Sequence, residues 1–154
     1  EKRPGEPSEL HLMSRKIQVP KALKGIAMFT FHELCARPLG AADYGLLASE
    51  FHILFITDIP VLNLDEKDLV RRFITLVDEL YEHRVKLICS ADAAMAKIFP
   101  YTIDPKQKGS STTLIAGEEE IFAFSRTLSR LSEMQTTEYL QSHHLKDPRI
   151  RDKV

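Results

Sequence analysis

Residues 71–92, RRFITLVDELYEHRVKLICSAD, contain side chains of the kinds that hydrolyse nucleotides. Asp78 and Glu79 form an adjacent acidic pair, and such a pair at a strand end can hold Mg²⁺ and orient water. Here the pair falls in the middle of a predicted helix, where a solvent-exposed helix face is the simpler interpretation. Ser90 and Asp92 follow an apolar run, at the edge where the ligands of α/β sheets gather. A turn and a helix cap explain them more simply than a sensor of nucleotide.

No phosphate-binding loop accompanies these acids. Gly40 and Gly45 have G-x-x-x-x-G spacing, but Leu46 and Leu47 stand where Lys and Ser or Thr are required. Without them the loop lacks a cation for the β- and γ-phosphates and a hydroxyl for Mg²⁺. The apolar run FHILFITDIP offers Asp58 alone where a Walker B strand carries two acids. The sequence therefore predicts neither Walker motif in this chain.

Two pairs of arginines are better candidates for phosphate chemistry. Arg71 and Arg72 lie in the early turns of a predicted helix, where the helix dipole disfavours positive charge. Arg126 and Arg130 lie four residues apart on another helix, so they repel each other unless they are paired. Salt bridges to the many nearby acids explain both pairs simply. The alternative is contact with phosphates, including stabilisation of a transition state by an arginine finger.

The cysteines and histidines offer little chemistry. His32 and Cys35, in HELC, could form a thiol or metal site, but no C-x-x-C or H-x-x-x-H completes it, so no metal ligand set is predicted. A thiol hydrolase using these residues stays as a minor hypothesis, and a buried free cysteine is the simpler one. Cys89 is expected in the core, and the chain's two cysteines indicate a reducing compartment.

Length and composition limit the possible classes. With 154 residues, of which 44% are hydrophobic, the chain is long enough for one globular domain with its own core. The net charge of −1 does not indicate a nucleic-acid surface. No apolar run approaches the ~20 residues of a transmembrane helix. EKRPGEPSEL, at the start, is polar and is interpreted as a boundary inside a longer chain.

Apolar periodicity predicts an α/β fold. A strand at 15–19, ending at Pro20, and a strand at 26–31 are expected to pair as a hairpin. A helix is expected at 41–50, and 51–91 reads as strand, helix, strand. Both of those strands are apolar throughout, which is typical of buried parallel strands. Asn63 is expected to cap the helix, whose buried stripe should contain the residues Val70, Phe73, Ile74, Val77, Leu80 and Tyr81.

The remaining segments complete the expected organisation. Residues 100–117 contain Pro, Gly and Ser and are predicted to be a mobile connector. One long helix should follow, with an apolar side that runs from Ile121 to Leu140. Residues 1–13 are expected to be a flexible boundary segment and 142–154 a tail.

Four stretches carry a resemblance to a known family. They are FTFHELCARPLGAADY (29–44), FITDIPVL (55–62), RRFITLVDELYEHRVKLICSA (71–91) and EEEIFAFSRTLSRLSEMQTTEYL (118–140). In this order they resemble the C-terminal part of the AAA-type ATPases called ATPase-family-gene-one-like proteins. The bacterial members of that family are the ZapE cell-division ATPases, and the eukaryotic members are mitochondrial. The resemblance covers residues 14–141, although Ser14 stands where glycine is usual.

The resemblance implies a fold, an activity and roles for the arginines. It implies a partial P-loop-type sheet, made of the βαβ unit and the N-terminal hairpin, with a long C-terminal helix. The phosphate loop and Walker B acids of the family would precede this region in a longer polypeptide, called the parent chain. The parent chain would bind ATP and Mg²⁺, and this chain alone would be inactive. Arg71 or Arg72 would act like an arginine finger, and Arg126 or Arg130 like a second sensor. Ser125 replaces an arginine that many members carry.

The resemblance also implies a cellular role. The parent chain would couple ATP hydrolysis to protein remodelling or quality control, acting on protein clients as a homo-oligomer. Features of TLIAGEEEIFAF and ITDIP favour mitochondria, with the cytoplasm as the place for a bacterial member. A non-enzymatic protein–protein interaction module is the alternative. Without the family's other part, an apolar sheet face or edge is expected to be exposed and to favour self-association.

Overall fold

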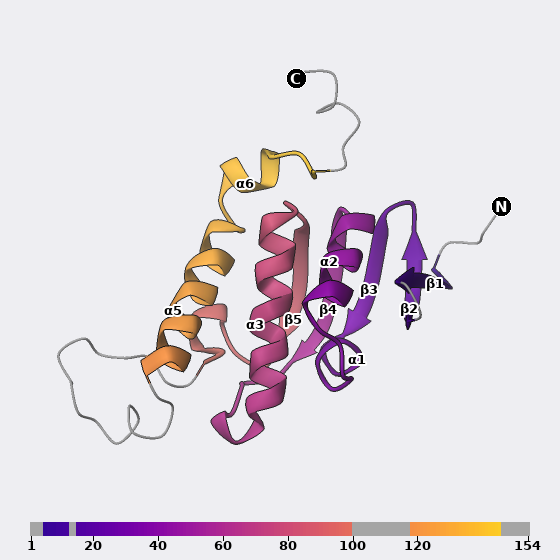
Figure 1. Ribbon diagram of the computed structural model, residues 1–154. Helices are drawn as coiled ribbons and strands as arrows, with labels where there is room; N and C mark the ends of the chain where they lie inside the picture. The colour runs from indigo at the N-terminus through magenta and orange to yellow at the C-terminus, as the bar shows by residue number, and fades with distance from the viewer. Residues whose placement is uncertain (1–4, 13–14, 100–117, 146–154) are drawn as a thin grey trace.

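The computed structural model describes residues 5–12, 15–99 and 118–145 (Figure 1). Its centre is a mixed sheet of five strands in the order β1-β2-β3-β4-β5. The strands are β1 (Glu6–Leu12), β2 (Arg15–Leu23), β3 (Ile26–Thr30), β4 (Ile53–Ile59) and β5 (Lys86–Ala91). The helices are α1 (Phe31–Cys35), α2 (Ala41–Glu50), α3 (Lys67–Glu82), α5 (Glu118–Glu133) and α6 (Thr137–Gln141), with short 3-10 helices at Leu64–Glu66 and Met95–Lys97. The predicted α/β class is confirmed.

β2 and β3 pair antiparallel as predicted, but through residues 21–23 and 26–28; the predicted strand at 15–19 pairs with β1. Lys24 and Gly25 form the turn between β2 and β3 with φ of 46° and 80°, and a Cβ on Gly25 would lie 2.4 Å from the His52 ring. The expected end of the first strand at Pro20 is wrong, because β2 continues to Leu23. Its pairing with β1 shifts register beside this proline, and a proline at such an irregularity removes no regular ladder hydrogen bond.

The predicted βαβ unit is confirmed as β4-α3-β5, with β3, β4 and β5 parallel. These three strands lie side by side in sequence order. When successive connections between parallel strands have the same hand, and each new strand is added on the same side of the last, their helices lie on one face of the sheet. Figure 1 shows α1, α2 and α3 on one side of the strands. The described strands contain no reversal of order like that of a doubly wound sheet, so the P-loop-type assignment stays a prediction.

The core lies between this face and the helices, and α3 packs between α2 and α5 (Figure 1). All of the predicted stripe of α3 is buried except Tyr81, which is partly exposed; Leu76 is buried as well. The prediction that 85–91 is a buried strand is wrong, because β5 lies at the edge of the described sheet and its Ile88 is 49% exposed. Asn63 accepts a hydrogen bond from the Asp65 N–H and so caps the 3-10 turn before α3.

The expected single C-terminal helix is divided in two. α5 ends at Glu133, and the Thr136 side chain caps the separate helix α6. Because the chain turns between the two helices, Leu140 is 52% exposed and Tyr139 is buried in its place. The Tyr139 hydroxyl donates to the Val85 carbonyl at 2.8 Å, which holds α6 against the start of β5.

The structure can be compared with the predictions for the boundary segment, the connector and the tail only in part. Residues 6–12, expected to belong to a flexible boundary segment, form β1. The predicted connector at 100–117 lies outside the described residues. In the predicted tail, the Leu145 N–H donates to the His83 carbonyl. No helix in the described part of the chain is both long enough and apolar enough to cross a membrane.

Candidate functional site

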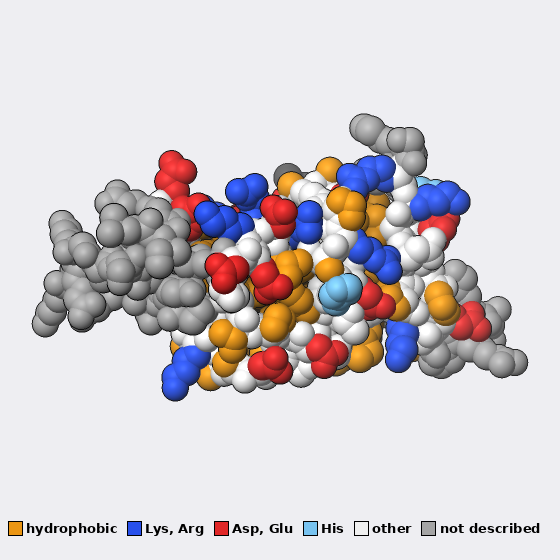
Figure 2. Space-filling model, turned by 90° about the horizontal axis from the view of Figure 1, so that it is seen from below, with side chains coloured by type: hydrophobic (Ala, Val, Ile, Leu, Met, Phe, Trp, Pro, Cys, Tyr) orange, Lys and Arg blue, Asp and Glu red, His pale blue; other side chains and the backbone are white. Residues whose placement is uncertain are grey.

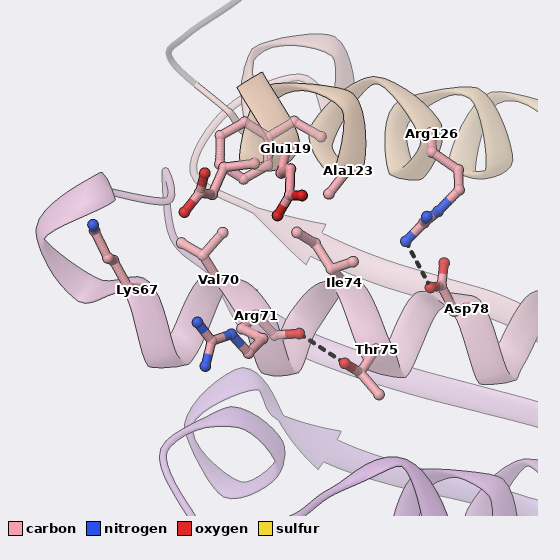
Figure 3. A pocket seen from close by; sticks show the side chains of 11 residues that line it. Lys67, Val70, Arg71, Ile74, Thr75, Asp78, Glu119, Ala123 and Arg126 are labelled. Carbon is pink, nitrogen blue, oxygen red and sulfur yellow. Dashed lines mark hydrogen bonds and ion pairs between the residues drawn. The ribbon is translucent and has the colours of Figure 1, made fainter. Parts of the chain in front are cut away.

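A groove of about 370 Å³ separates the N-terminal half of α3 from α5 (Figure 3). Its apolar part comes from the buried faces of both helices, and Figure 3 shows Val70 and Ile74 pointing from α3 toward α5. Its charged lining consists of Lys67, Arg71, Asp78, Glu119, Glu120 and Arg126. The groove therefore brings together Arg71 and Arg126, which the sequence had singled out separately.

Lys67 and Arg71 form a cationic pair at one end of this groove. Both side chains are exposed, and they lie at i and i+4 on α3, so their charges repel. Lys67 is the first residue of the helix, where the dipole adds to that cost. Within the described part of the chain, neither side chain forms an ion pair. The two cations therefore have no ionic partner among the described residues, although the carboxylates of Glu119 and Glu120 line the same groove.

Asp78 occupies the other end of the groove. Its carboxylate oxygens lie 3.1 Å from Arg126 Nη2 and 2.6 Å from Arg130 Nη1, and Figure 3 shows Arg126 reaching across to it. Arg130 also contacts Glu82 at 3.3 Å and lies over the Tyr81 ring. The interpretation of Asp78 as a solvated helix face is therefore wrong: its carboxylate joins α3 to α5. The salt-bridge explanation of Arg126 and Arg130 is confirmed.

Arg72 has a structural contact on the opposite side of α3. Its Nη1 donates to the carbonyl of Cys35 at 3.0 Å, which satisfies an oxygen at the C-terminal end of α1. Arg71, the residue beside it, lines the groove instead. Each of the two arginine pairs predicted from the sequence therefore has one member in the groove and one outside it. Arg71 and Arg126 line the groove, whereas Arg72 and Arg130 do not.

The C-terminal ends of β4 and β5 bring Asp58 and Ser90 together. The Asp58 N–H donates to Ser90 Oγ at 3.1 Å, and Thr57 Oγ1 donates to Asp58 Oδ2 at 2.8 Å. Asp58 has φ of 61°, an unusual value outside glycine, at an irregularity in the pairing of the two strands. The Asp92 N–H adds a further bond between the two strand ends by donating to the Ile59 carbonyl. These bonds link β4 to the end of β5, and the interpretation of Ser90 and Asp92 as a turn and a helix cap stays a prediction.

Figure 2 shows the molecule from the end where the parallel strands finish, with acidic side chains among hydrophobic ones. Across the described ranges, no group of three His, Cys, Asp or Glu side chains could hold a metal ion. Gly40 and Gly45 offer no phosphate cradle, because Gly40 precedes α2 and Gly45 lies inside it. The Tyr44 N–H already donates to the Gly40 carbonyl. The residues that the structure describes therefore do not fit Mg²⁺-ATP by themselves.

The thiol hypothesis fails on the environment of Cys35. Its side chain is buried in the core, and burial raises the pKa of the thiol to about 12. The reactive thiolate is then absent near neutral pH. His32 is exposed on α1, while Cys35 faces inward. Burial also raises the pKa of Cys89.

Comparison with protein families identifies the family of this chain. The AFG1-like ATPase model matches residues 2–143, which is nearly the whole chain. The chain belongs to the AFG1-like ATPase family. The resemblance of the four sequence stretches is thereby confirmed.

Individual relatives of this AFG1-like chain come from fungi, vertebrates and bacteria. An uncharacterised protein of Schizosaccharomyces pombe is 42% identical over 92% of the chain, and lactation elevated protein 1 homolog B of Danio rerio is 36% identical over 86%. Cell division protein ZapE of Escherichia coli is 37% identical over 75%. The matches cover 34%, 30% and 27% of these relatives, so the chain spans about a third of their length. No solved structure matches the chain.

Lys67 is the groove residue that the sequence reasoning missed. Its spacing to Arg71 was visible, since two cations at i and i+4 share one side of a helix. Asp65, Glu66 and Asp68 surround it in sequence, so the local composition has no excess of positive charge. In the structure those acids form no ion pair with it.

Proposed function

We propose that this chain is the C-terminal part of an AAA-type ATPase that couples ATP hydrolysis to protein remodelling or quality control. Membership of the AFG1-like ATPase family supports the class of activity. The chain has no phosphate loop, and it spans about a third of its relatives. In this proposal ATP and Mg²⁺ are held by another part of the polypeptide, and the chain itself supplies cationic side chains and helical packing.

One observation carries the assignment of a residue: Arg71 lines the groove with no ionic partner among the described residues. A finger-like arginine must be held by a rigid element and still have its guanidinium free for phosphate. Arg71 meets both requirements, because the buried stripe of α3 fixes its backbone. Lys67, one turn earlier, adds to the positive potential. Arg72 donates to a carbonyl and is assigned to support α1.

Arg126 is the better candidate for a role like that of a second sensor. Its side chain is about half exposed and has Asp78 as its ionic partner. Arg130 is more enclosed and is held by Asp78 and Glu82 together. A phosphate at the groove can therefore compete for Arg126 with less disturbance of the packing between α3 and α5.

The test is ATP turnover by a full-length AFG1-like ATPase that contains this segment. Arg71→Ala should lower the turnover rate about tenfold or more and leave nucleotide affinity nearly unchanged, as expected for a residue that acts on the transition state. Arg37→Ala is the matched control, because Arg37 is exposed on the loop after α1. Normal turnover of Arg71→Ala would refute the finger-like role.

The non-enzymatic interaction module is the second candidate, and one observation favours it: Met28 and Ile88 are exposed on the sheet face without helices. The same turnover assay distinguishes the two candidates, because a full-length protein without ATP turnover would support only the interaction module.

We further propose a mitochondrial location for a eukaryotic protein and a cytoplasmic one for a bacterial protein. Homo-oligomers and protein clients belong to the same proposal.

A further inference from the structure

The sheet face turned away from the helices carries a continuous apolar surface, called the open face below. Strand register aligns its apolar residues in two rows, one across β2 to β4 and the other across β3 to β5. The first row is Leu23, Ile26 and Ile53, and Lys86 follows it on β5. The second row is Met28, Phe55 and Ile88, and Lys21 precedes it on β2. The rows are adjacent, so their side chains make one surface.

Alternation along the strands shows that these side chains point away from the core. Ala27, Phe29, Leu54 and Ile56 are buried under the helices, and the open-face residues alternate with them along β3 and β4. On the open face, Met28 is 36% exposed and Ile88 is 49% exposed. Figure 1 shows α1, α2 and α3 on the other side of the sheet. Contiguous apolar surface of this kind marks an interaction site.

The size of the open face helps to choose its partner. Two rows, each about 6.6 Å deep and crossing three strands about 4.8 Å apart, give a footprint of roughly 200 Å². A stable interface between separate proteins buries about 800 Å² on each partner. A second copy that docked here alone would bind weakly. A partner in the same polypeptide needs less area, because the linkage gives it an effective concentration of about 1 mM.

The relatives have the polypeptide that such a partner requires. The matched region is 27–34% of their length, so most of each relative lies outside it. We propose that the open face is the surface against which the nucleotide-binding part of an AFG1-like ATPase packs. This inference rests on the proposed function, since it takes the ATP-binding part from the same polypeptide. Packing there puts the docked part and the groove of Lys67 and Arg71 on opposite faces of the sheet, so in this arrangement Arg71 would act on the nucleotide of a neighbouring copy in the proposed homo-oligomer.

Charge limits what the partner presents. Lys21 lies opposite Met28 in the register, at one border of the open face, and Lys24 lies in the adjoining turn. Both are exposed and have no ion pair within the described segments. The docked surface is therefore apolar in its centre, with acidic side chains toward the β2–β3 turn.

The experiment compares this chain alone with a full-length protein in which it replaces the matched third of the fission yeast relative. Ile88→Lys should lower the unfolding midpoint of the full-length protein by roughly 3 °C or more, because it would place a charge in the buried interface. In the chain alone it should change the midpoint little, since Ile88 is already half exposed. Phe122→Lys is the matched control, because Phe122 on α5 is 73% exposed.

An unchanged midpoint for Ile88→Lys in the full-length protein would overturn the proposal. So would sedimentation showing that the chain alone forms a tight dimer that Ile88→Lys dissociates, because a second copy would then be the occupant. If the full-length protein that carries this chain does not fold, a lysine substitution at the position aligned with Ile88 in the unaltered fission yeast relative gives the same comparison.

ATP turnover of Arg71→Ala is measured in a separate experiment. A failure of the finger-like role would therefore not affect the interpretation of the unfolding midpoints.

Discussion

At the scale of single residues, Asp78 determines which arginines are free. Its two carboxylate oxygens neutralise Arg126 and Arg130, which would otherwise repel each other one turn apart on α5. Arg71 lies on the same helix as Asp78 but points to the other end of the groove (Figure 3). The carboxylate thus ties Arg126 and Arg130 to α3, while Arg71 has no ionic partner among the described residues.

Removing the Asp78 carboxylate should therefore destabilise the fold. In Asp78→Ala, two arginines lose their shared partner at a partly enclosed site, and we expect a loss of about 1–2 kcal/mol in the free energy of unfolding. Glu82→Ala is the control and should lose less than about 0.5 kcal/mol, because the Glu82 side chain is mostly exposed. Urea unfolding of both variants measures the difference. Equal losses would mean that Asp78 is not the main link between α3 and α5.

At the scale of elements, α6 is a short helix held by polar contacts at the start of β5. Tyr139 donates its hydroxyl to the Val85 carbonyl and lies 3.3 Å from the Leu80 carbonyl. Lys86 Nζ donates to the carbonyls of Tyr139 and Ser142, at the end of the helix. Burial raises the pKa of the Tyr139 hydroxyl, which therefore stays a donor at physiological pH. A helix of five residues has little stability of its own, so these contacts hold it in place.

Tyr139→Phe tests that anchoring. It keeps the ring but leaves the Val85 carbonyl without its side-chain donor, so we expect the free energy of unfolding to fall by about 1–2 kcal/mol. Leu140→Ala, next in sequence but half exposed, should change it by less than about 0.5 kcal/mol. Thermal unfolding followed by circular dichroism compares the two. A larger loss for Leu140→Ala would restore the single long helix predicted from the sequence.

At the scale of the whole molecule, the chain has the family's sequence, but its described residues form neither a phosphate loop nor a metal site. The glycines with loop-like spacing are part of helix α2, and the described residues contain no set of metal ligands. Its free cations, Lys67 and Arg71, lie on the helical side, while the apolar open face lies on the other. A module with these two surfaces is suited to work on a nucleotide that another part holds.

The chain alone should accordingly neither bind nor hydrolyse ATP. Lys67 and Arg71 by themselves supply only exposed positive charge, whose attraction for a triphosphate is screened by physiological salt. Calorimetric titration with Mg²⁺-ATP at 0.15 M salt should show no binding in the micromolar range. Binding in that range would show that the chain contains a phosphate site that its sequence motifs do not reveal.

The sequence by itself determined the elements that local pattern controls. The buried stripe of α3, the hairpin of β2 and β3 and the parallel βαβ unit follow from apolar periodicity and turn residues, and the ordered motifs identified the family. Tertiary structure decided what depends on distant neighbours. Arg126 and Arg130 became ionic links because Asp78 on α3 faces them, and Tyr139 rather than Leu140 became buried because the chain turns before α6. Ile88 looked like core, yet it is exposed because sequential parallel strands place their helices on one face only.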